Sequence, residues 1–413
     1  MKYILVIGDG MADNPVQQLG GKTPLEAAHK PHIDAICAKS KLGSVLTVPA
    51  NQIPGSDTAI LSIFGCDPNV YFTGRSPLEA AGCGICVEPG SISYRCNMIC
   101  LEDGDKPFEE KKILSHSAGI EAEESIEIIT ALCADAEVQQ AMKELHLHIE
   151  PTPSFRHIAI QTQGSIEGFE AVPPHNILGS VIGQYRHHGS ETADKIWELM
   201  RLANEKLEHL PQNEARRQAG KLPANGIWIW AEGTAVELPS FWQSHHKTGS
   251  VISAVPLVHG IGSLLGLKMV HVEGATGETQ TNYEGKADAA VQCLLDGDDF
   301  VCVHVEAPDE ATHNGKLDEK LLSIEYLDRR VLARMMEKLD EAGQEYRILL
   351  LSDHKTLTST RGHDGDPVPF LIYDSSRPES SGLSYTEKNG ESGEFVPEGT
   401  KLMGMLLEEA ASK

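Results

Sequence analysis

Seven side chains between Asp9 and His363 form the group best suited to do chemistry in this chain. They are three carboxylates, three imidazoles and one hydroxyl: Asp9, Asp309, Asp353, His313, His354, His363 and Ser56. These ligands are more than one divalent ion needs, and mixed oxygen and nitrogen ligands suit two ions that share a phosphoryl group. The set therefore predicts metal-assisted phosphoryl transfer.

The spacing of the carboxylates and imidazoles fits this prediction. Asp309 and His313 are four residues apart, so one helical turn would place both on one face. Asp353 and His354 are adjacent at the end of an apolar run, where both side chains can turn toward one pocket. His363 lies in a glycine-containing loop. Each of these residue pairs and loops also occurs in solvated turns, ion pairs and helix caps, so none of them alone is specific for a metal site.

Ser56 has two possible roles. It opens an apolar helical pattern in PGSDTAILSIFG, where serine is a favoured N-cap. The same position places the hydroxyl in the positive potential of a helix N-terminus, where a bound metal would make it a nucleophile. The sequence alone does not separate capping from catalysis.

The elements that must position these side chains follow an α/β pattern. Buried parallel strands are predicted at the apolar runs 3–8, 300–306 and 347–353. A helix predicted at 317–341 makes the last two runs a βαβ unit. Ligands bind at the carboxyl ends of such strands, and Asp9, Asp309 and Asp353 fall there.

Other local signals complete this α/β part. TPLEAA from Thr23 and SPLEAA from Ser76 both predict a capped helix start with proline at the first position. Three further predictions are a strand near 42–48, a surface excursion at 375–395 and a last helix at 399–411.

The pattern changes from about residue 106. The predicted elements there are a helical stretch at 119–144, strands near 146–150 and 156–162, a helix at 190–209, a polar segment at 211–225 and a strand from Gly226. The simplest organisation is a core of residues 1–105 and 243–413, with an inserted α+β domain at 106–242.

Composition limits the classes of partner. A net charge of −25 argues against nucleic acid, although metal ions and local arginines would still attract a small anion. The sequence contains no apolar run of the ~20 residues that a membrane span requires. Nine cysteines, an odd number, and no signal peptide predict reduced thiols and a cytoplasmic location.

The order of these residues along the chain resembles that of the alkaline phosphatase superfamily. The resemblance implies a three-layer α/β/α core with a mostly parallel sheet and two divalent ions. It implies that the first ion takes Asp9, Ser56, Asp353 and His354. It implies that the second takes Asp309, His313 and His363.

Within that superfamily the chain most resembles the cofactor-independent phosphoglycerate mutases of the archaeal type. The phrases that carry the resemblance include IGDGMAD, PGSDTAILSIFGCDP, TGRSPLEAAGCGI, GATGETQTNYEGKA, VEAPDEATHNG and DHKTLTSTRGHDGDPVPF. It implies a glycolytic enzyme that interconverts 3- and 2-phosphoglycerate through phosphoserine at Ser56, without 2,3-bisphosphoglycerate, under a closing substrate-binding cap. For these ligands Mn²⁺ is favoured, with Zn²⁺ or Mg²⁺ as alternatives.

One position departs from this resemblance. Trp230 stands where an arginine is expected in the archaeal type. Absence of that arginine removes a bidentate contact to a carboxylate or phosphate. This variant resembles a bacterial branch proposed as homoserine kinases. A kinase, a metal-dependent phosphatase and a noncatalytic relative therefore remain alternatives, although GGKT at 20–23 lacks the first glycine of a P-loop.

Basic residues in and near the inserted domain are candidate contacts for a small phosphorylated substrate. They are Arg75, Arg95, Arg156 with His157, and Arg186 with His187. Arg156 is preferred because it opens a predicted strand of the inserted domain. Each arginine would equally suit a surface ion pair, and the oligomeric state is not predicted.

Overall fold

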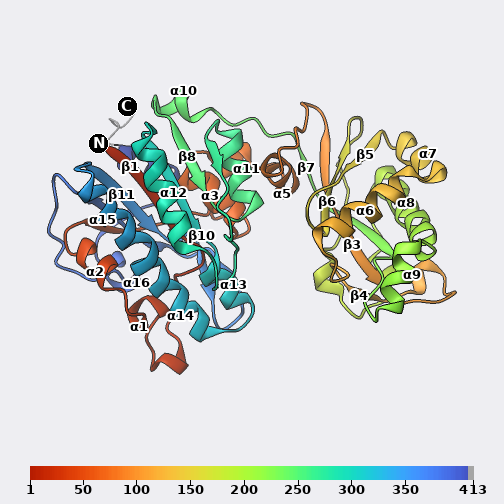
Figure 1. Cartoon of the computed structure of the whole chain (residues 1–413), viewed down its shortest axis with the longest axis horizontal. Coiled ribbons are helices and arrows are strands. Elements are labelled where there is room, and N and C mark those ends of the chain that lie inside the picture. Colours follow the sequence, from red (N-terminus) through yellow and green to blue (C-terminus); the bar gives the residue numbers. More distant parts are fainter. Residues whose placement is uncertain (408–413) are drawn as a thin grey trace. The chain divides into compact units, whose positions relative to one another are not determined.

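The computed structural model describes residues 1–407, which form two compact units (Figure 1). The first unit comprises Met1–Phe72 and the chain from Glu237 onward, and the second comprises Thr73–Val236. The insertion thus begins before the expected residue 106 and ends before 242. The first boundary lies earlier than expected because strand β3 (Ile92–Leu101) belongs to the second unit, where it pairs on its two sides with other strands.

The first unit is built on an eight-stranded sheet. Its strands, in spatial order, are β15 (Glu394–Val396), β2 (Lys41–Val45), β14 (Val368–Asp374), β11 (Tyr346–Leu351), β1 (Lys2–Gly8), β10 (Phe300–Val305), β8 (Gly249–Ile252) and β9 (Lys268–Val270). Strand β14 is antiparallel to both neighbours, and the other paired strands are parallel. The expectation of a mostly parallel sheet is confirmed.

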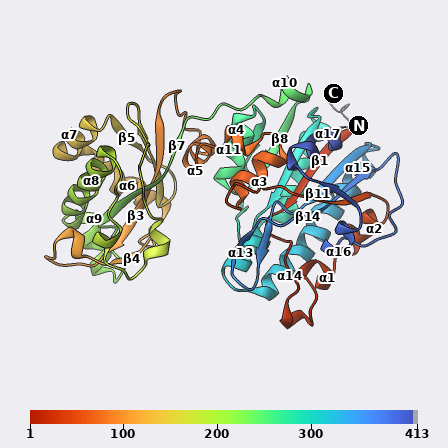
Figure 2. The ribbon, with the colours of Figure 1, turned by 180° about the vertical axis from the view of Figure 1, so that it is seen from behind.

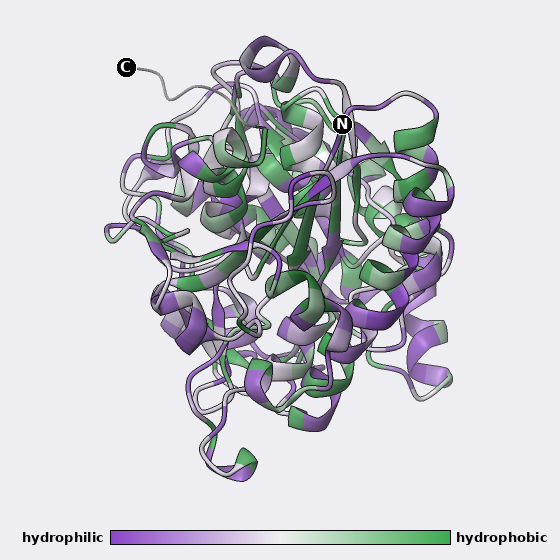
Figure 3. Ribbon diagram, turned by 90° about the vertical axis from the view of Figure 1, so that its left-hand side faces the viewer, coloured by the Kyte–Doolittle hydropathy of each residue, from purple (hydrophilic) through white to green (hydrophobic). Residues whose placement is uncertain are grey.

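Helices cover both faces of this sheet. One face carries α12 (Tyr283–Leu295), α14 (Leu317–Tyr326) and α15 (Ala333–Glu341) (Figure 1). The other carries α3 (Ser56–Ile63), α4 (Pro68–Tyr71), α11 (Pro256–Leu264) and α17 (Leu402–Leu407) (Figure 2). The central strands are predominantly hydrophobic, whereas the outer helices alternate hydrophilic and hydrophobic segments (Figure 3). The three-layer α/β/α core is therefore confirmed.

The predicted βαβ unit is present in modified form. Strand β1 lies between β10 and β11, so the crossover spans one strand. The expected helix at 317–341 is interrupted by a π-helical segment, Leu327–Leu332. Inside it, the buried Asp328 carboxylate accepts a 2.6 Å hydrogen bond from the Ile33 backbone N–H.

The two predicted helix starts differ. Thr23 caps α1 (Pro24–Ala27) with the full reciprocal capping box. The prediction for Ser76 is wrong, because α5 (Arg75–Gly82) begins two residues earlier, with Gly74 rather than Ser76 as its N-cap. Glu79 cannot complete a capping box there, since its carboxylate binds the Arg95 guanidinium instead.

The segment 375–395 is more than the expected surface excursion. It contains α16 (Glu387–Glu391) and reaches edge strand β15. The buried Glu387 carboxylate accepts hydrogen bonds from the Thr23 hydroxyl (2.6 Å) and the Asp13 backbone N–H (3.1 Å). These bonds and the buried Tyr385 tie the segment to the core. The last helix is described to Leu407, and its predicted end at 411 lies outside the described residues.

The second unit is an antiparallel α+β domain, as expected in class. Its strands are β3, β4 (Ile113–Ser115), β5 (Leu147–Glu150), β6 (Arg156–Gln161) and β7 (Gly226–Thr234). Its helices are α5, α6 (Ala122–Ala134), α7 (Ala136–Glu144), α8 (Glu191–Glu208) and α9 (Pro211–Gln218). The expected stretch at 119–144 is thus two helices, and the polar segment at 211–225 contains one.

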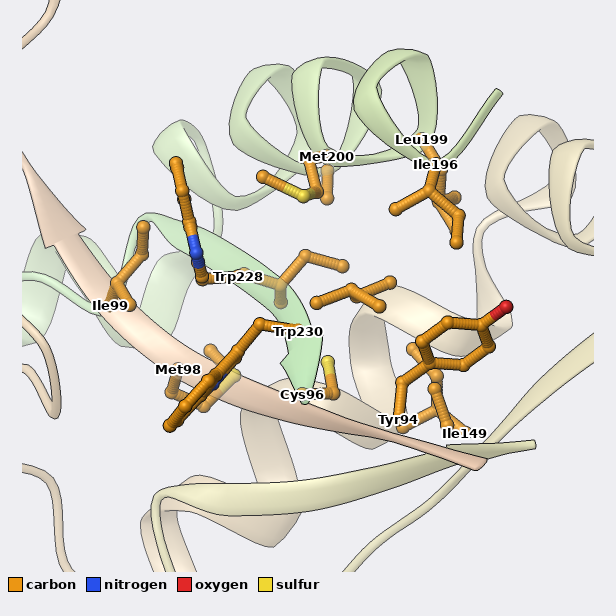
Figure 4. Close-up of a cluster of buried hydrophobic side chains, with 14 of the residues drawn as sticks. Tyr94, Cys96, Met98, Ile99, Ile149, Ile196, Leu199, Met200, Trp228 and Trp230 are labelled. Atoms are coloured by element: carbon orange, nitrogen blue, oxygen red, sulfur yellow. The ribbon is translucent and has the colours of Figure 1, made fainter. Parts of the chain in front are cut away.

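Large apolar side chains form the core of this unit. Trp228, Met200 and Leu199 are packed in one cluster between α8 and the sheet (Figure 4). The cluster gives the second unit a hydrophobic interior of its own. In neither unit does a described helix have the length and apolar character needed to cross a bilayer.

Candidate active site

The candidate site lies where three neighbouring strands of the first unit end. Asp9 follows β1, and Asp353 and His354 follow β11. Strand β10 leads into α13 (Ala307–His313), which carries Asp309. Because β11, β1 and β10 are adjacent and parallel, their carboxyl ends meet at one edge.

Ser56 is placed as a nucleophile would be. Gly55 is the N-cap of α3, and Ser56 is its first helical residue, with no side-chain capping bond. Its Oγ lies 3.1 Å from His354 Nε2 and 3.4 Å from Asp9 Oδ2. Of the two roles that the sequence left open, the structure does not show capping, and the Ser56 hydroxyl faces the carboxylate and imidazole cluster.

A second group of side chains surrounds Asp309. His313 Nε2 lies 3.1 Å from Asp309 Oδ2, and His363 Nε2 lies 3.5 Å from Asp309 Oδ1. The two imidazole Nε2 atoms are 2.9 Å apart. His363 reaches this position from a short hairpin, β12 (Lys355–Leu357) with β13 (Gly362–Asp364). The structure thus brings all seven predicted side chains into one region.

The buried carboxylates carry an excess of negative charge. Burial raises the pKa of Asp9 well above its ordinary value, and repulsion from Asp353 and Asp309 raises it further. Burial would also raise the pKa of Asp309, but hydrogen bonds with His313 and His363 outweigh burial and hold it well below. The hydrogen bond between His313 and Asp309 raises the pKa of His313 to about 9.

Two buried oxygens indicate where cations fit. Asp9 Oδ1 and Asp353 Oδ2 have no hydrogen-bond partner among the described residues. A buried carboxylate without compensation is costly, and a bound cation would supply that compensation and reverse the pKa shift of Asp9. Asp309, His313 and His363 offer a set of three donor atoms within 4.8 Å of one another, as do Asp9, Asp309 and His354.

Sequence reasoning missed two buried residues that hold these ligands. The Thr356 hydroxyl donates a 2.5 Å hydrogen bond to Asp309 Oδ1 and lies 3.3 Å from His354 Nδ1. His304 Nε2 lies 3.0 Å from Asp9 Oδ2. The only signal for His304 is an imidazole inside an otherwise apolar strand, and Thr356 gave none.

The second unit contains a cationic cluster centred on Glu79. Arg95 binds this carboxylate through two nitrogens, Arg75 Nε lies 3.2 Å from it and Arg156 Nη1 lies 3.9 Å from it. The coulombic effect of Arg95 and then Arg75 overcomes burial and lowers the pKa of Glu79 to about 2. Three guanidinium groups around one carboxylate leave a net positive charge.

Two histidines that sequence reasoning missed adjoin this cluster. Burial and the positive charge of Arg156 lower the pKa of His116, and burial, His116 and Arg95 lower that of His175. Trp230, which stands where an arginine was expected, also packs against this cluster. Its indole N–H donates to Asn97 Oδ1 at 3.0 Å, and the Arg95 guanidinium lies 4.8 Å from its ring centroid.

The remaining basic candidates are placed differently. His157 is fully buried, and both ring nitrogens are hydrogen-bonded, to Ser125 Oγ and the Thr152 backbone N–H. His187 is also fully buried, with Nε2 donating to the Ile229 carbonyl. These two histidines are structural, because no donor atom faces solvent. Arg186 forms an exposed 3.0 Å ion pair with Asp194.

Comparison with known proteins shows the family to which the chain belongs. The model of the Metalloenzyme superfamily matches residues 1–409. A curated relative from Geobacter sulfurreducens, named a probable 2,3-bisphosphoglycerate-independent phosphoglycerate mutase, is 42% identical over 99% of this chain and 100% of its own. One from Methanosarcina barkeri, named without that qualifier, is 41% identical over 98% of this chain and 99% of its own.

A solved structure shows the same fold. The cofactor-independent phosphoglycerate mutase from Thermoplasma acidophilum superposes with a TM-score of 0.64 at 25% identity, covering 99% of each chain. The resemblance found in the sequence motifs is thereby confirmed.

Proposed function

The chain belongs to the family of 2,3-bisphosphoglycerate-independent phosphoglycerate mutases within the metalloenzyme superfamily, and we propose that it interconverts 3-phosphoglycerate and 2-phosphoglycerate. Ser56 would take the phosphoryl group from one hydroxyl of the substrate, hold it as phosphoserine and return it to the other hydroxyl. Such a reaction would place the enzyme in glycolysis. Nine free cysteines support our proposal of a cytoplasmic location.

The observation that carries the proposal is the environment of Ser56. Its hydroxyl has no capping role and lies 3.1 Å from His354 Nε2. Asp9 Oδ2, at 3.4 Å, is close enough to orient the hydroxyl. A serine so placed, beside two buried carboxylates that each have one oxygen without a hydrogen-bond partner among the described residues, is suited to nucleophilic attack on phosphorus.

We propose that two divalent ions, Mn²⁺ by preference, complete this site. Asp9, Ser56, Asp353 and His354 would hold the first ion. Asp309, His313 and His363 would hold the second. When bound, the ions would lower the pKa of the Ser56 hydroxyl and stabilise negative charge on the phosphoryl group. The ligand set contains oxygen and imidazole nitrogen without thiolate, which suits Mn²⁺, with Zn²⁺ or Mg²⁺ as alternatives.

We propose the second unit as the substrate-binding cap. Arg75, Arg95 and Arg156 offer guanidinium groups that suit a carboxylate or phosphate, and Glu79 fixes their orientation. His116 and His175 would add neutral donors beside them, because their lowered pKa values favour the uncharged ring. Water exclusion by such a cap would protect phosphoserine from hydrolysis.

The test measures the conversion of 3- to 2-phosphoglycerate without added 2,3-bisphosphoglycerate, with and without Mn²⁺. Metal-dependent conversion is expected. Release of inorganic phosphate instead would indicate a phosphatase. Phosphohomoserine formed from ATP and homoserine, with no mutase activity, would indicate the kinase alternative.

Substitution of the nucleophile tests the covalent step. Ser56→Ala should abolish both turnover and phosphoenzyme formation while the far-ultraviolet circular dichroism spectrum is retained. Ser263→Ala, at an exposed serine of α11, is the matched control and should retain wild-type activity. Full turnover by Ser56→Ala would contradict the phosphoserine mechanism.

A further inference from the structure

A buried histidine inside the central sheet contacts the candidate site. His304 lies on β10, and its side chain is fully buried. An imidazole on an apolar strand needs partners for both ring nitrogens. It has them: Nε2 faces Asp9 Oδ2 at 3.0 Å, and Nδ1 faces Ser253 Oγ at 3.1 Å.

The surrounding bonds define the tautomer of this ring. Ser253 Oγ accepts a 3.0 Å hydrogen bond from the Val255 backbone N–H, which holds the serine beside His304 Nδ1. An ionised carboxylate only accepts, so Nε2 carries the proton that it donates to Asp9 Oδ2, and Nδ1 of the neutral ring accepts from the Ser253 hydroxyl. Lys286 Nζ donates to the His304 carbonyl at 3.0 Å and holds the backbone of the same residue.

The two carboxylate oxygens of Asp9 therefore have different environments. Oδ2 accepts from His304 and lies 3.4 Å from the Ser56 hydroxyl. Oδ1 is buried, has no hydrogen-bond partner among the described residues and lies 3.7 Å from His354 Nε2. Rotation of the carboxylate would exchange these two environments, and the bond from His304 opposes it.

We propose that His304, oriented by Ser253, is a positioning residue that fixes the Asp9 carboxylate so that Oδ1 is presented to the first ion. Hydrogen bonds to a ligating carboxylate set its orientation and strengthen metal binding. The inference rests on the proposed function for its effect on turnover, whereas its effect on metal binding does not require that function.

The hydrogen bonds of His304 argue against a third ion bound at these atoms. Asp9, His304 and Glu306 offer donor atoms within 4.8 Å of one another. A metal ligand must present a lone pair, but His304 Nε2 carries a proton and Nδ1 is occupied by Ser253. His304 thus acts through Asp9 and does not bind a metal itself.

The test is a calorimetric titration of Mn²⁺ into the metal-free full chain. His304→Leu should weaken one of two binding events by about 10- to 100-fold and leave the other unchanged. His304→Gln should recover most of that loss, because its amide N–H can still reach Asp9. Ser253→Ala, a smaller change that leaves the ring in place, should weaken the same event by a smaller factor. In turnover, His304→Leu should lower kcat more than it raises KM.

The results that would overturn the positioning role of His304 can be told apart. Equal weakening of both events in the Leu and Gln variants would show a general structural role. A third bound ion that is lost in His304→Leu would make His304 a ligand. Unchanged Mn²⁺ binding in both His304→Leu and Ser253→Ala would also overturn the proposal. If the wild type binds two ions but lacks mutase activity, the proposed function fails while the positioning role stands.

Discussion

At the scale of single residues, the site depends on side chains that hold the ligands as much as on the ligands. Thr356 links the two proposed ion sites, because its hydroxyl donates to Asp309 and also contacts His354. Its position is fixed by the hairpin, where Thr356 is paired with His363. One hydroxyl thus contacts one proposed ligand of each proposed ion.

Removal of this hydroxyl should therefore affect both sites. Thr356→Val keeps the shape but removes the hydroxyl that donates to Asp309 Oδ1, and we expect Mn²⁺ affinity to fall about 10- to 100-fold at one or both sites. Thr356→Ser keeps the hydroxyl and should stay near wild type. Mn²⁺ calorimetry with thermal melting as the stability control measures this. Equal affinity in the valine and wild-type proteins would contradict it.

Buried neutral histidines make the second unit sensitive to acid. Burial lowers the pKa of both His157 and His187 from 6.5 to about 4. Because the folded-state pKa lies below the ordinary value, their contribution to stability is complete above pH 6.5. It is lost as the pH falls toward 4. Each histidine should cost about 2 kcal/mol of unfolding free energy at pH 5 relative to pH 7.

Tryptophan fluorescence during urea unfolding can measure this loss. Trp197, Trp228 and Trp230 are buried in the second unit, so they report its unfolding. The decrease between pH 7 and pH 5 should be smaller in His157→Gln. It should be unchanged in His209→Gln, at an exposed histidine of the same unit. Stability that does not vary over this range would be inconsistent with buried neutral rings.

At the scale of elements, the ends of strands position the site. The apolar runs that form β1, β10 and β11 were predictable from sequence because strands buried on both faces are continuously apolar. Their order in the sheet was not, since it is fixed by pairing between distant segments. Whether Ser56 caps its helix was equally unpredictable, because that depends on one backbone conformation at Gly55.

The turn after β1 gives an element-scale prediction. Gly10 has φ +57°, and a Cβ added there would lie 2.7 Å from Asp309 Oδ1. Gly10→Ala combines left-handed strain with displacement of a ligand, so Mn²⁺ binding and turnover should both fall sharply. Gly20→Ala is the matched control, because Gly20 has φ +69° with open space around it. Comparable losses in both variants would attribute the effect to backbone strain alone.

At the scale of the whole molecule, the predicted functional residues are distributed over two units with separate hydrophobic cores. All seven predicted metal and nucleophile residues belong to the first unit, and the arginine cluster belongs to the second. The sequence indicated an insertion from its change of pattern, but it placed the first boundary too late. Strand β3 is buried along its whole length but carries Ser93, Arg95 and Asn97, and its pairing with β6 and β7 assigns it to the insertion.

The corrected boundaries can be tested by excision. The Thr73 hydroxyl donates a 2.6 Å hydrogen bond to the Thr234 carbonyl, so the ends of the second unit lie together. A chain in which a short Gly/Ser linker replaces residues 73–236 should therefore fold and bind Mn²⁺ as the full chain does, without mutase activity. Fragment 73–236 alone should unfold cooperatively, because it contains its own core.

Deletion of residues 106–242 provides the contrast for this experiment. It would leave β3 in the first unit without β6 and β7, so its exposed edges should cause aggregation. Size-exclusion chromatography and Mn²⁺ calorimetry on the two shortened chains measure the difference. If the 106–242 deletion were monomeric and bound Mn²⁺ while the 73–236 deletion aggregated, the division at Thr73 and Val236 would be wrong.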